Sequence, residues 1–317
     1  MQGYMGIDVG SVSTNLVLLD IDNKITDTLY LRTKGLPIEA VQLALSNILK
    51  RNRNIEIRGV GTTGSGRQLA ALMVGADVVK NEITAHAMAA IHEQPDVQTV
   101  IEIGGQDSKL IFIRNKVIAD FSMNTVCAAG TGSFLDQQAA RLNMSIEEFS
   151  KQALASKAPV QIAGRCAVFA ESDMIHKQQA GYLLTDIING LCHALVRNYF
   201  NNLGKGKRVN GPILFQGGVA ANPGMRRAFE TALGQPVIIP RYYNVMGAVG
   251  AALLAREQIK NGISAFRGVK LINDTYSSRS FECDGCPNRC EIIEFQINSA
   301  VAARWGDRCG KWNGLAV

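Results

Sequence analysis

The sequence predicts an α/β protein made of two duplicated domains, followed by a small cysteine-rich segment. The main evidence is a hairpin that occurs twice: residues 7–16 read IDVGSVSTNL and residues 101–110 read IEIGGQDSKL. Each copy is an apolar strand that ends in an acid, a glycine turn and a second apolar strand. A repeated unit indicates an internal duplication, and its antiparallel start excludes the βαβ opening of a dinucleotide-binding fold.

Apolar periodicity and turn residues place the elements in order. Residues 37–50 are typical of a helix because Ile38, Val41, Leu45 and Ile48 follow one stripe, and Pro95 marks the break before the second copy. Strands are expected over 5–20 around the first glycine turn, 24–31, 55–60, 99–103, 110–113, 117–124, 212–215 and 237–239. Helices are expected over 37–50, 66–74, 83–92, 131–142, 145–154, 165–179, 182–202, 223–233 and 245–260.

These elements suggest four parts of the chain. Residues 1–95 form the first predicted subdomain, 96–244 the second, 245–265 a helix that returns to the first, and 266–317 the cysteine-rich extension. With 317 residues, the chain is long enough for two domains. We expect a cleft between the two duplicated halves.

Composition and charge exclude several classes of protein. Apolar residues make up 47% of the chain and charged residues 19%, so disorder is not expected. The net charge of +6 is scattered, which argues against a nucleic-acid partner. There is no basic region before the first strand and no apolar stretch of membrane-spanning length. We therefore expect a cytoplasmic protein without a membrane partner, in which the seven cysteines serve metal or cluster chemistry rather than disulfides.

Three glycine-rich segments are candidates for binding a nucleotide. The paired turns at Gly10-Ser11 and Gly104-Gly105 let backbone N–H groups approach phosphate oxygens, and Asp8 is placed to hold the accompanying Mg²⁺. Residues 217–222, GGVAAN, offer bare backbone to a base or ribose, with Asn222 placed to cap the next helix. Residues 61–67, GTTGSGR, lack the Gly-Lys-Ser/Thr ending of a P-loop and are interpreted as a flexible loop.

Longer motifs make a family resemblance specific. The paired hairpins, the Gly-Gly-Val-Ala-x-Asn turn and the helix around Gly247 resemble the acetate- and sugar-kinase, heat-shock chaperone and actin superfamily, whose two domains are ribonuclease H-like. Residues 102–107 (EIGGQD), 124–136 (NTVCAAGTGSFLD) and 164–173 (GRCAVFAESD) resemble the ATP-dependent activators of 2-hydroxyacyl-CoA dehydratases, which are related to the ATPase subunits of benzoyl-CoA reductase. The resemblance covers roughly residues 4 to 260.

The resemblance implies an ATP-hydrolysing reductase. It implies that ferredoxin or flavodoxin supplies single electrons, which pass to an iron–sulfur acceptor enzyme, with Gln106 or Asp107 positioning the attacking water. It also implies a homodimer that shares one [4Fe-4S] cluster through Cys127 and Cys166 of each subunit, in accord with the four thiolates that such a cluster needs. The residues expected to contact ATP/ADP and Mg²⁺ are Asp8, Gly10, Ser11, Ser13, Thr14, Gly104, Gly105, Gln106, Gly130, Gly132, Gly217, Gly218, Val219, Asn222 and Gly247.

The cysteine-rich extension departs from the minimal family pattern. Cys283, Cys286, Cys290 and Cys309 follow a metal-binding spacing. Three interpretations stay open: a structural Zn²⁺ site, a second Fe–S cluster that relays electrons, or a reduced four-cysteine docking patch. The segment is too small for a core of its own, so a tetrahedral Zn²⁺ site there would stabilise it.

Two other functions remain possible on the same scaffold. A small-molecule kinase of the N-acetylhexosamine type would use Asp107 as a base toward a sugar hydroxyl. A nucleotide-dependent switch without enzymatic activity would use the cleft alone. Neither alternative explains Cys127 and Cys166 in their motifs.

Overall fold

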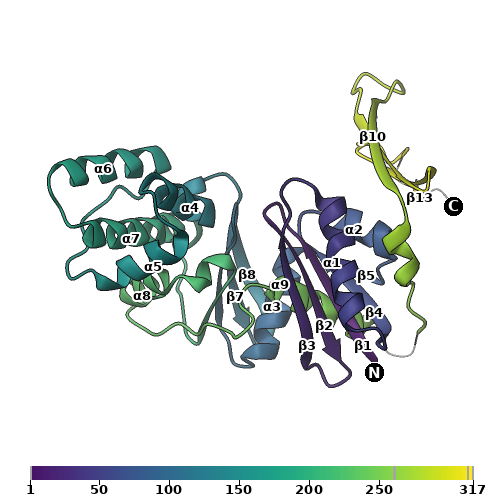
Figure 1. Cartoon of the computed structure of the whole chain (residues 1–317), viewed down its shortest axis with the longest axis horizontal. Helices are drawn as coiled ribbons and strands as arrows, with labels where there is room; N and C mark the ends of the chain where they lie inside the picture. Colours follow the sequence, from purple (N-terminus) through teal and green to yellow (C-terminus); the bar gives the residue numbers. More distant parts are fainter. Residues whose placement is uncertain (1, 260–261, 313, 316–317) are drawn as a thin grey trace. The chain divides into compact units, whose positions relative to one another are not determined.

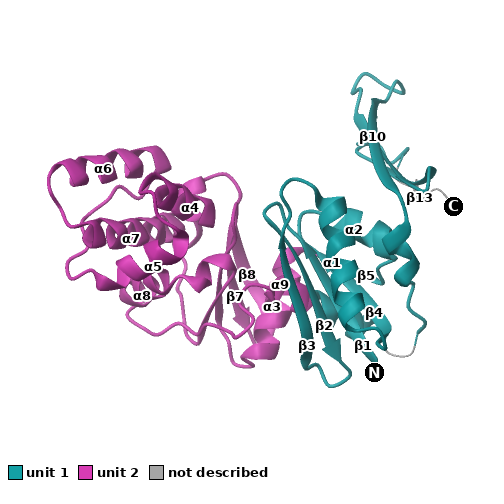
Figure 2. Ribbon diagram, viewed as in Figure 1, with its two compact units in different colours: residues 1–80, 251–317 teal, residues 81–250 magenta. Residues whose placement is uncertain are grey.

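The computed structural model describes residues 2–259, 262–312 and 314–315. Two compact units make up the chain: residues 1–80 with 251–317, and residues 81–250 (Figure 2). This division places residues 82–93 in the second unit, whereas the sequence expectation places them before the boundary at residue 95. The four expected domains stay a prediction. Residue 260, expected to end a helix, and residues 313, 316 and 317 of the expected extension lie outside the described residues.

The first unit contains a sheet of five strands and a separate sheet near the C-terminus (Figure 1). The strands of the first sheet follow the order β3-β2-β1-β4-β5. They are β1 (Gln2–Val9), β2 (Ser13–Asp20), β3 (Ile25–Arg32), β4 (Glu56–Thr63) and β5 (Val78–Val79). Helices α1 (Pro37–Arg51) and α2 (Arg67–Val74) pack on this sheet through an apolar core that includes Ile7, Leu16 and Val41.

The second unit repeats this arrangement. Its sheet has the order β8-β7-β6-β9, with strands β6 (Thr99–Ile103), β7 (Ser108–Arg114), β8 (Val117–Asn124) and β9 (Ile213–Gln216). A parallel bridge between Leu214 and Ile238 stands where β5 pairs with β4 in the first unit. The predicted strand over 237–239 is thus reduced to a single bridge.

Most helices of the second unit lie between β8 and β9 in the sequence. Between these strands lie η1 (Ala128–Gly130), α4 (Gly132–Arg141), α5 (Ile146–Ala155), α6 (Ala167–Gln179) and α7 (Leu184–Leu203). Helix α3 (Glu82–Glu93) precedes β6, and η2 (Gly218–Ala221) and α8 (Pro223–Leu233) follow β9. Figure 1 shows α5, α7 and α8 on one side of the sheet and α3 on the other. The core on the first side is centred on Tyr199, Phe215 and Phe229, whose rings pack edge to face or tilted.

One matching contact shows that the two units repeat the same turn. Gly64, after β4, has φ +91°, and a Cβ there would lie 2.4 Å from Val9 O and 2.6 Å from Asp8 Oδ1. Gly217, after β9, has φ +89°, and a Cβ there would lie 2.4 Å from Ile103 O and 2.7 Å from Glu102 Oε1. Only glycine tolerates both this φ and this close approach. The interpretation of residues 61–67 as a loop is corrected: they are the end of β4 and a tight turn packed on β1, the counterpart of the Gly217 turn.

The cysteine-rich extension forms an antiparallel sheet. After η3 (Val269–Asn273) come β10 (Tyr276–Glu282), β11 (Glu291–Ile297), β12 (Ala300–Trp305) and β13 (Gly314–Leu315). Phe295 is fully buried and belongs to the same core as Leu271, Met5 and Ile7 of the first unit. The segment thus does not rely on a core of its own, because Phe295 and Ile297 of β11 join the core of the first unit.

Helix α9 (Met246–Gln258) contains the boundary between the units and packs closely in each. A Cβ at Gly61 would lie 2.0 Å from Ala251 O, and a Cβ at Gly250 would lie 1.8 Å from Ala85 O.

Among the described residues, no helix combines the length and the apolar character needed to span a bilayer.

We predict that Gly250→Ala destabilises the protein. In an unhindered helix, this change gains about 1 kcal/mol, but here the added methyl meets the Ala85 carbonyl, and overpacking costs about 1–3 kcal/mol. Urea unfolding should show a lower free energy of unfolding. Gly218→Ala is the control, because nothing lies within 4 Å of a Cβ at that position. A Gly250→Ala variant about 1 kcal/mol more stable than the wild type, as in an unhindered helix, would contradict the close packing of α9 on α3.

Candidate functional site

The strand ends beside the two hairpin turns carry equivalent rows of polar residues. In the first unit, Asp8 on β1 lies opposite Asn15 on β2 and Thr63 on β4. In the second unit, Glu102 on β6 lies opposite Lys109 on β7 and Gln216 on β9. Opposite residues of paired strands project from the same face of a sheet, so each unit presents an acid flanked by two polar side chains.

The row in the first unit has unused polar atoms. Within the described part of the chain, neither Asn15 Oδ1 nor Thr63 Oγ1 has a hydrogen-bond partner, although both atoms are buried. Buried oxygens without partners are rare and indicate a bound water, ion or ligand group. Carboxylate, amide and hydroxyl oxygens are suitable Mg²⁺ ligands or water partners. The donor set beside Asp8 therefore fits a metal that accompanies a phosphate.

The turn of the first hairpin is narrow and its tip is accessible. Gly10 N donates to Ser13 O at 2.9 Å, and Ser11 at the tip is exposed. Thr14 is fully buried, and its hydroxyl shares a 3.0 Å hydrogen bond with the Thr33 hydroxyl. Gly10 and Ser11, which were predicted to contact the nucleotide, present accessible backbone. Thr14, also predicted to contact it, is instead buried and stabilises the hairpin through its hydrogen bond to Thr33.

In the second unit, the equivalent row is filled by a buried lysine. Lys109 Nζ lies 2.7 Å from Glu82 Oε2, 2.9 Å from Glu102 Oε2 and 2.9 Å from Asp107 Oδ1, and its side chain is 2% exposed. Burial raises the pKa of the Glu102 carboxyl to about 8, and the three carboxylates raise the pKa of Lys109 well above its ordinary value. Glu82 and Lys109 were not identified from the sequence, because α3 and β7 meet only in the folded chain.

The two candidates for positioning a water differ in their surroundings. Asp107 is held by Lys109, whereas Gln106 is exposed at the tip of the turn. Gly104 N donates to Asp107 O at 3.0 Å, which closes the turn. The Gln106 side chain is thus the accessible one of the pair.

The backbone of this turn also receives hydrogen bonds from the start of α4. Gly132 N donates to Gly104 O and Ser133 N donates to Gly105 O, both at 2.9 Å. A Cβ at Gly132 would lie 2.9 Å from Gly104 O and 3.0 Å from Val219 Cγ2, so glycine is required for this approach. The two bonds connect the predicted phosphate turn to the segment that carries Cys127.

The Gly217–Asn222 segment presents backbone to solvent at one point. Gly218 is exposed with nothing within 4 Å of a Cβ, while Val219 beside it is buried. Asn222 Oδ1 accepts from Met225 N at 3.1 Å, so the predicted N-cap of α8 is present. Gly247, another predicted contact, is buried in the first turn of α9.

Cys127 and Cys166 both lie directly before a helical element of the second unit. Cys127 precedes η1 and Cys166 precedes α6, and both cysteines are half-buried. The Asn124 side chain shapes the Cys127 segment: its Oδ1 accepts from Cys127 N at 2.9 Å and its Nδ2 donates to Cys127 O at 2.8 Å. Apolar side chains are exposed beside both cysteines, with Val126 95% and Phe169 66% exposed.

No cluster of three or more His, Cys, Asp or Glu side chains suited to a metal is found among the residues that the structure describes. Each chain offers two accessible thiols on helix-start segments, where negative charge is favoured. Such a donor set fits a thiolate-ligated cluster only if a second chain completes it.

The C-terminal cysteines lie outside the strands of the small sheet: Cys283, Cys286 and Cys290 between β10 and β11, and Cys309 after β12. Cys283 is buried, and its Sγ accepts from Trp312 Nε1 at 3.2 Å and Gly285 N at 3.4 Å; these hydrogen bonds, the indole first, lower the pKa of its thiol. Cys283 N donates to Cys290 O at 2.8 Å, whereas Cys286 and Cys309 are exposed. The predicted metal site at these cysteines stays a prediction.

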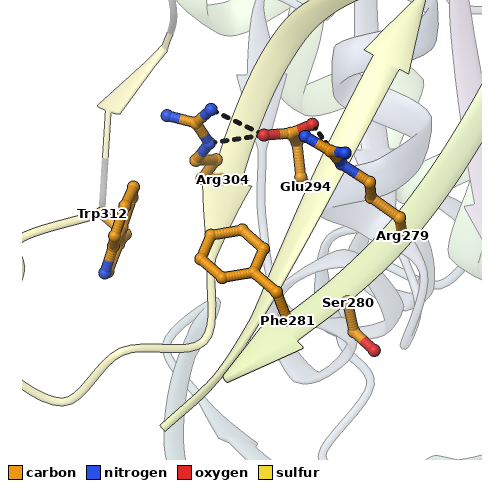
Figure 3. A pocket seen from close by; sticks show the side chains of 6 residues that line it. All are labelled: Arg279, Ser280, Phe281, Glu294, Arg304 and Trp312. Atoms are coloured by element: carbon orange, nitrogen blue, oxygen red, sulfur yellow. Dashed lines mark hydrogen bonds and ion pairs between the residues drawn. The ribbon is translucent and has the colours of Figure 1, made fainter. Parts of the chain in front are cut away.

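A surface pocket of about 380 Å³ lies on the same small sheet (Figure 3). Its floor is a row of charges across three strands, in which the fully buried Glu294 pairs with Arg279 at 2.7 Å and Arg304 at 2.6 Å. These hydrogen bonds, that from Arg279 first, lower the pKa of Glu294 to about 2. Figure 3 shows Phe281 and Trp312 beside the row. Because both Glu294 oxygens are paired, the row serves to hold the strands together.

Comparison with known proteins identifies relatives for most of the chain. The model of the BadF/BadG/BcrA/BcrD ATPase family matches residues 5–255. The (R)-2-hydroxyglutaryl-CoA dehydratase activating ATPase of Acidaminococcus fermentans is 35% identical over 255 residues, which cover 79% of this chain and 96% of that protein. An uncharacterized protein of Methanocaldococcus jannaschii is 32% identical over 259 residues, covering 79% of this chain, but the chain spans only 61% of that protein's length.

A solved structure supports the fold directly. The activator of the 2-hydroxyisocaproyl-CoA dehydratase from Clostridium difficile, with bound ADPNP, superimposes with a TM-score of 0.75 at 30% identity and covers 81% of this chain and 96% of that one. The predicted fold class and family resemblance are thereby confirmed. The family match ends at residue 255, so β10 to β13 lie outside it.

We predict that Lys109→Met destabilises the protein by about 3–5 kcal/mol at pH 8, the cost of leaving buried charges without a partner. Without the ammonium, the folded-state pKa of Glu102, which burial already raises, rises further. Groups with raised pKa values stabilise the fold at low pH and lose that contribution as the pH increases. The deficit should therefore shrink between pH 8 and pH 5 in urea unfolding.

The matched control is Arg226→Met. Arg226 pairs with Glu230 at 3.0 Å on the exposed face of α8, where such pairs contribute less than about 1 kcal/mol. A small, pH-independent loss in Lys109→Met, equal to that in the control, would show that the buried charges do not depend on Lys109.

Proposed function

Because the chain belongs to the BadF/BadG/BcrA/BcrD ATPase family, we propose that it is an ATP-hydrolysing iron–sulfur reductase. It takes single low-potential electrons from ferredoxin or flavodoxin and passes them to an iron–sulfur acceptor enzyme. The observation that carries this proposal is the pair of hydrogen bonds from Gly132 and Ser133 to the Gly104-Gly105 turn, because they join the phosphate turn to the Cys127 segment.

The hairpin turns hold ATP and its metal in this proposal. Asp8 and its row orient Mg²⁺, while the Gly10-Ser11 and Gly104-Gly105 turns approach the phosphates. Gly10 N and Gly104 N close the turns, so Ser11 and Gly105 offer their backbone N–H groups. Gln106 orients the attacking water, since a glutamine aligns a water without taking its proton. Asp107 then serves the turn through its ion pair with Lys109. The exposed Gly218 backbone accommodates the flat base or ribose.

Cys127 and Cys166 of two copies hold the [4Fe-4S] cluster, which, when bound, supplies one-electron storage at low potential. The exposed Val126, Val168 and Phe169 beside the cysteines are suited to a contact between copies, because isolated apolar side chains of this size gain from burial there. Cys166 lies directly before α6, and the start of a helix favours the negative charge of a ligated cluster.

The nucleotide acts on the cysteines through the backbone. A change in the phosphate turn alters the carbonyls that accept from Gly132 and Ser133, and hence the start of α4, a few residues after Cys127. The acceptor is a 2-hydroxyacyl-CoA dehydratase, a benzoyl-CoA reductase or another double-cluster protein. The activator names of the relatives support this class over a sugar kinase.

We predict that anoxically prepared protein is a dimer with about four iron atoms per two chains, and that Cys127→Ser and Cys166→Ser each lose this iron. Iron analysis, the visible spectrum and sedimentation provide the measurements. The control is Cys192→Ala, because burial raises the pKa of Cys192 to about 12 and keeps it a neutral core thiol.

The doubly substituted chain separates the two sets of cysteines. Iron or zinc that remains in Cys127→Ser/Cys166→Ser is bound by the C-terminal cysteines, as a second cluster or a zinc site respectively, whereas a metal-free chain supports the reduced docking patch. Wild-type protein that is monomeric and free of iron under anoxia would overturn the proposed reductase.

We further predict that Gln106→Ala slows ATP hydrolysis by roughly 10²-fold, the scale of losing one group that acts in the transition state. Because Gln106 is exposed and is not one of the ion-pair partners of Lys109, iron content and spectrum should stay as in the wild type. Phosphate release and the visible spectrum are measured on the same sample. Unchanged hydrolysis would assign the water to Asp107 instead.

A further inference from the structure

We propose that Asn198 is a positioning residue for the cluster: its amide ties the two cysteine-bearing segments together and donates a hydrogen bond to the Cys127 sulfur. This inference rests on the proposed function. Asn198 was not identified from the sequence, and its role goes beyond supplying ligands.

One buried amide group contacts both segments. Asn198 lies on α7 and is 2% exposed. Its Nδ2 lies 2.7 Å from Gly164 O, 3.3 Å from Arg165 O and 3.6 Å from Cys127 Sγ. Arg165 directly precedes Cys166, so the amide joins the backbone beside one cysteine to the sulfur of the other.

A neighbouring asparagine determines which way the amide points. Asn202 Nδ2 donates to Asn198 Oδ1 at 2.9 Å, one helical turn further along α7. The oxygen is thereby engaged, and the amino group is directed toward the cysteine segments. Of its two hydrogens, one serves the Gly164 and Arg165 carbonyls and the other serves the sulfur.

Two glycines leave space for this arrangement. A Cβ at Gly130 would lie 2.8 Å from Asn198 Oδ1 and 3.1 Å from Asn124 Nδ2. A Cβ at Gly164 would lie 3.0 Å from Ala194 O and 3.3 Å from Arg197 Cβ, on the turn of α7 before Asn198. Gly130, predicted to contact the nucleotide, therefore has a second role: it allows the Cys127 segment to approach the amide.

The amide suits a sulfur that ligates iron. A protonated Cys127 thiol can donate to Asn198 Oδ1, at 3.8 Å, but a ligating thiolate has no proton and only accepts. The N–H from Nδ2 then remains as its partner. A hydrogen bond to a ligating sulfur favours the more negative, reduced state and so raises the reduction potential.

The test is the midpoint potential of the cluster in Asn198→Asp. It is measured in an anoxic redox titration that is monitored by electron paramagnetic resonance. The change preserves side-chain size but replaces the N–H donor with an acceptor, so the potential should shift to a more negative value. Asn189→Asp is the matched control, because it makes the same change at a buried position of α7, more than two turns from Asn198. Its potential should equal that of the wild type.

A second variant covers loss of the cluster. Should Asn198→Asp bind no iron while Asn189→Asp binds it fully, Asn198→Ser is the test. This variant is uncharged, and its side chain is too short to reach the sulfur. It should hold iron and show the negative shift of the potential. Variants at position 198 that keep the wild-type potential would overturn the role of Asn198 and leave the reductase proposal intact. A wild type without iron would instead overturn the reductase proposal, and this inference with it.

Discussion

The way in which α4 begins is the constraint on which the proposed coupling depends. The first N–H groups of a helix have no partners inside the helix, and here Gly132 and Ser133 donate theirs to the carbonyls of Gly104 and Gly105. The hairpin turn therefore acts as the cap of the helix. Because a side chain at Gly132 would collide with Gly104 O, the contact leaves little freedom. A displacement of the turn must move the helix start or break these bonds, and the segment before that start carries Cys127.

The duplicated halves use the same backbone for different electrostatic purposes. Gly64 approaches the end of β1 at Asp8 as closely as Gly217 approaches the end of β6 at Glu102. The two acids therefore occupy equivalent places. Beside Asp8, buried oxygens remain without partners in the described chain, as a metal or water site requires. Beside Glu102, Gln216 Oε1 also lacks a partner among the described residues, but Lys109 occupies the equivalent row and its single positive charge pairs with three carboxyl groups. The first half is thus suited to bind a cation, whereas the second has an internal cation and is suited to support a rigid turn.

The sequence was informative where periodicity and turn chemistry are local. The repeated hairpin, the helices and the Asn222 cap of α8 all follow from short-range patterns, and the family match confirms the fold. The missed features join distant residues: Glu82 to Lys109 across α3 and β7, and Asn198 to Cys127, 71 residues apart. A lone Lys or Asn in an apolar segment carries no signal of its partner. Residues 61–67 resemble a flexible loop in composition, whereas the contact of Gly64 with Val9 and Asp8 joins segments more than 50 residues apart.

The small C-terminal sheet shows why a cysteine pattern alone is a weak guide to what stabilises a segment. Phe295 inserts into the core of the first unit, and Glu294 is held between Arg279 and Arg304 across three strands. A buried carboxylate with all its oxygens paired penalises any slip of strand register, because a slip would leave the charge unpaired. These contacts help to order the sheet whichever group its cysteines bind. A structural Zn²⁺ site, a second Fe–S cluster and a reduced docking patch therefore all stay compatible with the sheet, because its core and its charge row do not depend on the cysteine side chains.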